Sequence, residues 1–313
     1  MDITLRQLRY FLALSRTGHF GRAADACAVS QPALSVQIKE LEATLGGALV
    51  DRSARGFALT PLGHEIAEQA GRVSAEAEAL VAIARARRGL EGVFSLGLIP
   101  TIAPYLLPAA LDLIRRRLPL LDLRVREATT DELLSELQEG RLDACVIAAP
   151  AGRDDLDDRF LLEDQFLLAV HGREAQDLGL VDGQIKVEQV AEMRLLLLDE
   201  GHCLRDQALS FCQMTARDAT TQLGASSMAT LLRLVAGGYG VTLTPEMAFD
   251  EVKAQRPLKL LSLASPQPSR QIHFVTKAMR DGSAPYGPLA EVLAEAAAVR
   301  QAEAQNMRTI DNV

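Results

Sequence analysis

The chain has 313 residues, of which 48 % are hydrophobic and 24 % are charged. This length exceeds what one core usually fills, so it predicts two or three domains. The net charge of −8 excludes a protein that binds nucleic acid over its whole surface. No stretch approaches about 18 uncharged apolar residues, and Arg6 and Arg9 interrupt the apolar stretch at the N-terminus. We therefore expect neither a membrane span nor a signal peptide, and a cytoplasmic location.

The charge is distributed unevenly along the chain. Residues 1–92 hold eleven Lys or Arg and ten Asp or Glu, a net charge of +1, which leaves −9 for the remainder. Any contact with nucleic acid should therefore come from the first third of the chain.

Residues 3–16 and 20–27 predict two helices, and a third begins after Ser30, a suitable N-cap, with Pro32 in its first turn. The third helix should bury its four regularly spaced apolar residues, Leu34, Ile38, Leu41 and Leu45. Its polar face carries Gln31, Ser35 and Lys39. Glutamine can bond adenine through two hydrogen bonds, serine can bond a base or a phosphate, and lysine can bind a phosphate. This arrangement predicts a helix-turn-helix that reads double-stranded DNA.

Two short strands are predicted within residues 48–60, around a basic turn that contains Arg52 and Arg55. Such a turn would act as a wing on the phosphate backbone. Residues 61–89 then predict a helix of about 40 Å, which is too long for the core of a small domain. We expect this helix to pair with a second copy of the chain.

Strands and helices alternate beyond residue 90, which predicts a parallel α/β sheet. Residues 160–170 should cross into a second subdomain and residues 270–275 should return. The predicted domains are a winged helix-turn-helix at 1–60, a linker and dimerisation helix at 61–89, a regulatory domain at 90–302 and a polar tail at 303–313. Within the regulatory domain, one subdomain joins about 90–164 to 270–302, and the other is about 165–269. The expected binding cleft lies between them, beyond the carboxyl ends of the strands.

The four cysteines, Cys27, Cys145, Cys203 and Cys212, are too few and too scattered for the disulfide framework of a secreted protein. Cys27 and Cys145 lie in apolar surroundings that predict core positions. Neither a metal site nor a cofactor is expected, because no His and Cys spacing fits metal ligation.

Cys203 should open a helix after a turn at Gly201. The helix macrodipole, His202 beside the thiol and Arg205 nearby would favour the thiolate, which is the form that attacks an oxidant. Cys212 lies nine residues further on, about 13 Å along a helix, whereas a disulfide needs Cα atoms within about 7 Å. A disulfide between these two would require the segment to leave the helix, and would then be a switch. Alternatively, Cys212 is a small buried hydrophobe.

Residues 3–66 resemble the winged helix-turn-helix of LysR-type transcriptional regulators. The resemblance implies that Gln31, Pro32, Ser35 and Lys39 lie on the recognition helix, with Ser30 at its start and Arg52 and Arg55 at the wing. It also implies inverted-repeat DNA as target, a homotetramer built as a dimer of dimers, RNA polymerase as partner, and a two-lobed regulatory domain similar to periplasmic binding proteins.

Residues 201–208, the pair Phe211 and Cys212, and residues 98–101 resemble the branch of this family that senses hydrogen peroxide. This resemblance implies that Cys203 is the peroxidatic cysteine and Cys212 the resolving one. It implies a dithiol reductant such as a glutaredoxin or thioredoxin. It also implies that the peroxide is bound by Thr101, Thr130, His202, Asp206 and Arg270. Thr129 is an alternative to Thr130, because the two are adjacent.

Three other functions compete with a peroxide-sensing activator. A LysR-type regulator that responds to a small metabolite would leave Cys203 and Cys212 inert. A thiol peroxidase would be an enzyme, but it would not need the first 90 residues, so we expect no enzyme. A periplasmic solute-binding protein would need an export signal, which the N-terminal sequence does not predict.

Overall fold

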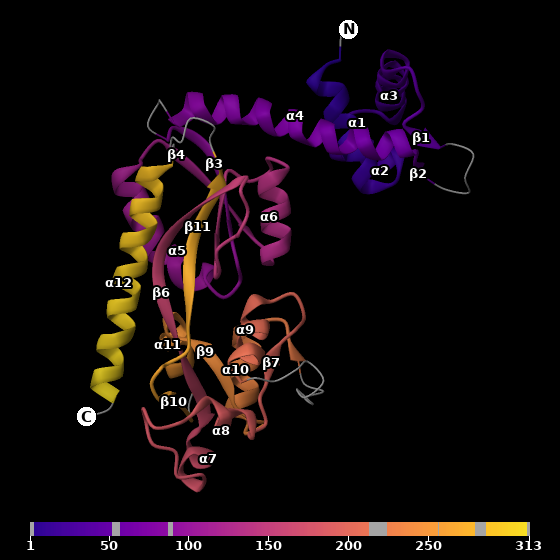
Figure 1. The fold of residues 1–313 in the computed structure, drawn as a ribbon. Helices are drawn as coiled ribbons and strands as arrows, with labels where there is room; N and C mark the ends of the chain where they lie inside the picture. The colour runs from indigo at the N-terminus through magenta and orange to yellow at the C-terminus, as the bar shows by residue number, and fades with distance from the viewer. Residues whose placement is uncertain are drawn as a thin grey trace. The chain divides into compact units, whose positions relative to one another are not determined.

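The computed structural model describes residues 3–51, 57–86, 90–212, 224–255, 257–278 and 286–311. They form two compact units, one built around residues 1–84 and the other around residues 85–313. Figure 1 draws the helices and strands of both and labels most of them. In the part of the chain that the structure describes, no helix is both long enough and apolar enough to cross a membrane.

The N-terminal unit is a winged helix-turn-helix followed by a long helix. Its elements are α1 (Leu5–Thr17), α2 (Phe20–Ala26), α3 (Gln31–Leu45), the antiparallel strands β1 (Val50–Asp51) and β2 (Ala58–Leu59), and α4 (Pro61–Ala86). The side chains of Phe11, Leu14, Leu34, Ile38 and Leu41 are fully buried and form its core. The predicted burial of Leu34, Ile38 and Leu41 is therefore confirmed, whereas Leu45 is only partly buried.

The start of the wing is tied to α3 by a carboxylate. Glu42 accepts hydrogen bonds from the backbone N–H groups of Leu49 (2.9 Å) and Val50 (3.2 Å). The Thr60 hydroxyl closes the other side by donating to the carbonyl of Ala48 at 2.7 Å. The turn with Arg52 and Arg55 lies outside the described residues.

The larger unit contains a seven-stranded sheet with the order β10-β6-β11-β5-β3-β4, in which β9 also pairs with β6. Its first subdomain consists of β3 (Gly92–Leu98), α5 (Ala103–Arg117), β4 (Leu121–Glu127), α6 (Thr130–Gln138) and β5 (Ala144–Ile147), completed by β11 (Ser269–Lys277) and α12 (Gly287–Asp311). β6 (Leu156–His171) leads to the second subdomain (Figure 1).

The second subdomain encloses its own apolar core. Its elements are α7 (Gly172–Asp177), α8 (Val187–Ala191), β7 (Leu197–Leu198), α9 (Cys203–Phe211), β8 (Gly224–Ala225), α10 (Met228–Ala236), β9 (Thr242–Pro245), the 3-10 turn η1 (Glu246–Ala248), α11 (Phe249–Lys253) and β10 (Leu258–Ser262). The four consecutive leucines at 195–198 are buried in this core, which positions the start of α9.

The sheet is mixed, so the prediction of a parallel sheet was right only for part of it. β3 pairs in parallel with β4 and β5, but β11 pairs antiparallel with β5 and with β6. The physical reason is the length of β6, whose 16 residues run through both subdomains. Its first half pairs with β11 and its second half with β9 and β10.

Within the predicted polar tail at 303–313, the residues up to Asp311 continue the helix α12. Ala304 is fully buried and packs in a small cluster with Leu167 and Phe249. Most residues of this segment are polar, so the narrow apolar stripe on one face of the helix was not recognised in the sequence.

We expect Ala304→Asp to lower the free energy of unfolding of the larger unit by about 2 to 4 kcal/mol, because it buries a carboxylate without a partner. Ala302→Asp, two residues away on the exposed face of α12, should change it by less than about 0.5 kcal/mol. Urea unfolding followed by far-ultraviolet circular dichroism measures both. Equal effects of the two substitutions would mean that Ala304 is not part of the core.

Candidate redox site

Three loops converge at the N-terminus of α9 and line a small pocket. Gly201 has φ +91°, the left-handed conformation that the turn before α9 requires. His202 follows as the N-cap residue, and Cys203 is the first residue of α9. The pocket is lined by Ile99, Pro100, Thr101, Thr129, Thr130, Gly201, His202 and Cys203. The loops after β3 and β4 thus meet the loop after β7, as expected for the carboxyl ends of strands.

The two adjacent threonines at the start of α6 differ in what they contact. Thr129 donates to the carboxylate of Glu132 through its backbone N–H (3.1 Å) and its hydroxyl (3.0 Å). The Thr130 hydroxyl is close enough to the Cys203 thiol to lower the pKa of that thiol. Its oxygen is buried and has no hydrogen-bond partner within the described part of the chain. Of the two threonines, Thr130 is therefore the one whose hydroxyl acts on the thiol.

Arg270 supplies the positive charge of the site. Its Nη1 donates to Thr101 Oγ1 at 2.8 Å and its Nη2 to the Thr101 carbonyl at 2.9 Å. Its Nε donates to Asp164 Oδ2 at 3.0 Å. All three residues are buried, with exposed fractions of 1 to 3 %. Because Thr101 Oγ1 accepts from Arg270, its own hydroxyl proton is available to a pocket ligand.

The pKa of Cys203 is raised above its ordinary value, mainly by burial. The Arg270 charge, the Thr130 hydroxyl and the backbone N–H of Leu204 oppose this rise, whereas Asp206 adds to it. The expectation that His202 and Arg205 would favour the thiolate was wrong. The Arg205 guanidinium donates to the Leu198 carbonyl at 3.0 Å, and burial outweighs the charge near the thiol.

The other residues predicted to bind the peroxide differ in their exposure and in whether they line the pocket. His202 is partly buried and lines the pocket. Asp206 is exposed in the first turn of α9 and is not a lining residue. Arg270 is not a lining residue either, but it donates a hydrogen bond to Thr101, which is one.

The other cysteines occupy apolar positions, and all four are free thiols. Cys212 is the C-cap residue of α9 and is 5 % exposed in the core of the second subdomain, where burial raises its pKa to about 11. Cys145 is fully buried in β5, where burial raises its pKa to about 12. The core prediction is therefore confirmed for Cys145, whereas Cys27 is only partly buried and packs against the edge of the N-terminal core.

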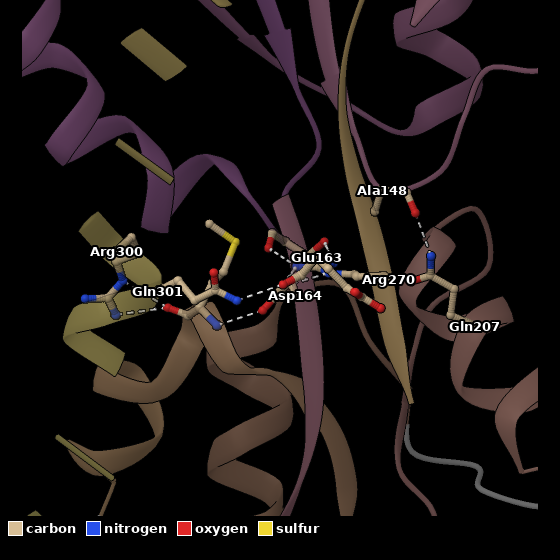
Figure 2. A network of polar contacts seen from close by, with 9 residues as sticks. Ala148, Glu163, Asp164, Gln207, Arg270, Arg300 and Gln301 are labelled. Carbon is tan, nitrogen blue, oxygen red and sulfur yellow. Dashed lines mark hydrogen bonds and ion pairs between the residues drawn. The ribbon is translucent and has the colours of Figure 1, made fainter. Parts of the chain in front are cut away.

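Asp164 and Gln207 were not predicted as members of this site. The side chain of Gln207, on α9, donates to the carbonyl of Ala148 after β5 at 2.8 Å (Figure 2). Asp164 carries the carboxylate that holds Arg270. The sequence did contain a signal for Asp164, because an acid within the apolar run 160–170 needs a buried partner.

The described residues among the predicted DNA contacts lie at the N-cap and in the first nine residues of α3. The Ser30 hydroxyl accepts from the backbone N–H of Ala33 at 3.4 Å and caps the helix. Gln31, Pro32 and Lys39 are exposed, and Ser35 is partly buried. Among the described residues there is no group of three or more His, Cys, Asp or Glu side chains that could hold a metal ion.

Two family models match the chain. One describes a bacterial regulatory helix-turn-helix protein of the lysR family and matches residues 5–64. The other describes a LysR substrate binding domain and matches residues 87–298.

The chain is also similar to individual relatives and solved structures. A probable hydrogen peroxide-inducible genes activator of Streptomyces viridosporus is 42 % identical over 302 residues, 94 % of each chain. The DNA-binding transcriptional dual regulator OxyR of Escherichia coli K12 is 36 % identical over 293 residues, 93 % of this chain and 95 % of that one. A full-length cysteine-to-aspartate variant of OxyR from Pseudomonas aeruginosa is 33 % identical and aligns with a TM-score of 0.71 over 94 % of this chain and 97 % of that one. A hydrogen-peroxide-bound cysteine-to-serine variant of Corynebacterium glutamicum OxyR is 29 % identical, with a TM-score of 0.64 over 98 % and 96 %.

We expect the rate of alkylation of Cys203 by iodoacetamide to keep rising with pH beyond about pH 9. The reason is that burial raises the pKa of the thiol and only the thiolate reacts. Thr130→Val removes a hydroxyl that stabilises the thiolate. It should raise the pKa further and slow alkylation at neutral pH about threefold or more. Thr129→Val is the matched control and should leave the rate unchanged. Peptide mass spectrometry at several pH values measures each rate, and equal rates for the two variants would contradict the assignment.

Proposed function

The chain belongs to the LysR family of bacterial transcriptional regulators, and on that premise we propose that it is a DNA-binding activator that responds to hydrogen peroxide through Cys203. The observation that carries this proposal is the setting of the Cys203 thiol. It lies at a helix N-terminus, in a pocket lined by three threonines, and a buried guanidinium stabilises its thiolate. The names of the relatives support the same activity.

Hydrogen peroxide would bind where the predicted residues Thr101, Thr130 and His202 line the pocket. The thiolate of Cys203 would attack one peroxide oxygen and break the O–O bond, so that sulfur is oxidised and the other oxygen leaves as hydroxide. Arg270 would stabilise the negative charge that develops, acting together with Thr101. A proton then converts hydroxide to water. Asp206 stays a predicted member of the site, on its exposed side.

Cys212 would resolve the sulfenic acid. Its thiolate would attack the Cys203 sulfur, expel hydroxide and leave a disulfide. Since the intact helix α9 separates the two residues by about 13 Å, α9 must unwind for this step. Unwinding would remove Cys212 from the apolar core and break the bond between Gln207 and Ala148. A dithiol reductant such as a glutaredoxin or thioredoxin would reverse the oxidation.

The DNA-binding part of the proposal rests on the exposed start of α3. Gln31, Pro32, Ser35 and Lys39 would enter the major groove behind the Ser30 cap, and Arg52 and Arg55 would contact phosphates. We assign DNA binding to residues 1–60, linkage and dimerisation to 61–89, and regulation to 90–302. A homotetramer on inverted-repeat DNA, recruitment of RNA polymerase and a cytoplasmic location complete this proposal. As a transcriptional regulator, the protein would not be an enzyme.

A second candidate is a LysR-type regulator that responds to a metabolite. One observation favours it, namely that burial raises the pKa of Cys203 and so makes the thiol less reactive. The same pocket would then hold a small polar molecule, and both Cys203 and Cys212 would be redox-inert.

We expect stoichiometric hydrogen peroxide to produce a peptide linked through Cys203 and Cys212, detected by mass spectrometry without reductant and removed by a dithiol. Cys212→Ser should stop at the sulfenic acid of Cys203, which dimedone traps. Cys203→Ser should abolish both products and transcriptional activation, whereas the control Cys27→Ser should change neither. Oxidation of Cys203 no faster than that of Cys27 or Cys145 would favour the metabolite-responsive candidate.

We expect Gln31→Ala to weaken binding to DNA duplexes selected from a random library by the unaltered protein. The loss should be about tenfold, the size of one bidentate contact with a base. Thr44→Ala, at the exposed C-terminal end of α3, is the control and should bind as the unaltered protein does. Fluorescence anisotropy at fixed salt measures both affinities. A loss of equal size in both variants would contradict a specific role for Gln31.

A further inference from the structure

We propose that Asp164 is the positioning residue that holds Arg270 in the orientation needed for reaction at Cys203. This inference rests on the proposed function and adds to it a residue that does not line the pocket. Asp164 lies in β6, the strand that joins the two subdomains, and is 1 % exposed.

Both oxygens of the Asp164 carboxylate are engaged (Figure 2). Oδ2 accepts from Arg270 Nε and lies 3.0 Å from Nη2, while Oδ1 accepts from the backbone N–H of Met247 at 3.1 Å. The carbonyl of Met247 accepts in turn from Nε (3.1 Å) and Nη2 (2.9 Å) of Arg300, on α12. The backbone of Met247 therefore holds the Asp164 carboxylate, and Arg300 in turn holds the backbone of Met247.

The end of the Arg270 guanidinium contacts Thr101, a residue that lines the pocket. Its Nη1 and Nη2 donate to the hydroxyl and carbonyl of Thr101. The planar guanidinium is thus bound along two adjacent edges, by Asp164 at Nε and Nη2 and by Thr101 at Nη1 and Nη2. If the Asp164 edge is lost, the group keeps only its hydrogen bonds to Thr101 and gains freedom to turn about its long side chain. The distance between its charge and the Cys203 sulfur would then be less closely set.

The alternative is that Asp164 only neutralises the buried charge of Arg270. The two possibilities predict opposite results when the carboxylate is replaced by an amide. An asparagine has one acceptor oxygen, so it can accept from Arg270 or from Met247 but directs its NH₂ at the other donor. If Asp164 positions Arg270, Asp164→Asn lets the guanidinium move and so weakens its stabilisation of the thiolate. If Asp164 only neutralises Arg270, Asp164→Asn leaves the positive charge uncompensated and so strengthens that stabilisation.

Other ionisable groups surround this network and enter any pH profile. Glu246, on η1, raises the pKa of Asp164, and Arg270 lowers the pKa of Tyr105, on α5. Asp206, on α9, raises the pKa of Cys203. These groups are unchanged in the variants compared below, so a difference between profiles reports on Asp164 and Arg270.

The experiment compares Asp164→Asn with the unaltered full-length chain between about pH 6 and pH 10. Two rates are measured for Cys203, oxidation by hydrogen peroxide and alkylation by iodoacetamide. We expect both rates at pH 7 to fall about tenfold and the midpoint of the profile to move up by about one pH unit. Glu163→Gln is the matched control, because it removes the same charge from an exposed neighbouring position in β6. It should leave both profiles unchanged.

Unchanged profiles for Asp164→Asn would overturn the proposal, and faster reaction with a lowered midpoint would show that Asp164 only neutralises charge. If Asp164→Asn does not fold, Arg270→Met is compared with the double variant that also carries Asp164→Asn. Equal rates in these two support action through Arg270, and a further decrease overturns it. If the unaltered protein does not react with peroxide, the proposed function fails, whereas the alkylation profiles still test the role of Asp164.

Discussion

The geometry of α9 is the constraint on which this structure depends. An unbroken helix keeps Cys203 and Cys212 about 13 Å apart, so the two thiols can coexist without pairing. Side chains hold that helix at several points. Arg205 donates to the Leu198 carbonyl at the end of the preceding strand, and Gln207 donates to Ala148 in the other subdomain. Burial of Cys212 in the apolar core holds the far end. The reduced form is therefore a packed structure, which covalent chemistry would have to disrupt.

Burial of the Cys203 thiol disfavours its charged thiolate form, and the surrounding residues partly offset this effect. A thiol removed from water favours its neutral form, which does not attack peroxide. Arg270 opposes this effect because its charge is also buried and therefore weakly screened. A buried guanidinium needs a partner of its own, and Asp164 supplies it. The positive charge near this sulfur is thus part of a polar network that reaches through β6 to Met247 and Arg300.

The sequence predicted the local parts of this arrangement better than the long-range ones. The convergence of Thr101, Thr130 and Cys203 could be inferred because each follows a strand, and such ends meet in an α/β sheet. The partner of Arg270 could not, because Asp164 lies 106 positions away and only the register between β6 and β11 pairs them. The antiparallel pairing of β6 was missed for the same reason. Because Arg205 is close to Cys203 in sequence, it was expected to favour the thiolate. In the structure its guanidinium donates a hydrogen bond to the Leu198 carbonyl instead.

The contact between Gln207 and Ala148 links the chemistry at α9 to the shape of the regulatory domain. Gln207 belongs to the second subdomain, and Ala148 follows β5 in the first. A change that unwinds α9 removes this hydrogen bond, whereas β6 and β11 continue to join the subdomains through their backbone ladder. Under the proposed mechanism, the covalent event would therefore alter a side-chain contact between subdomains without breaking the sheet that connects them. Oxidation would in this way shift the balance between two folded arrangements, which is the property that a reversible switch requires.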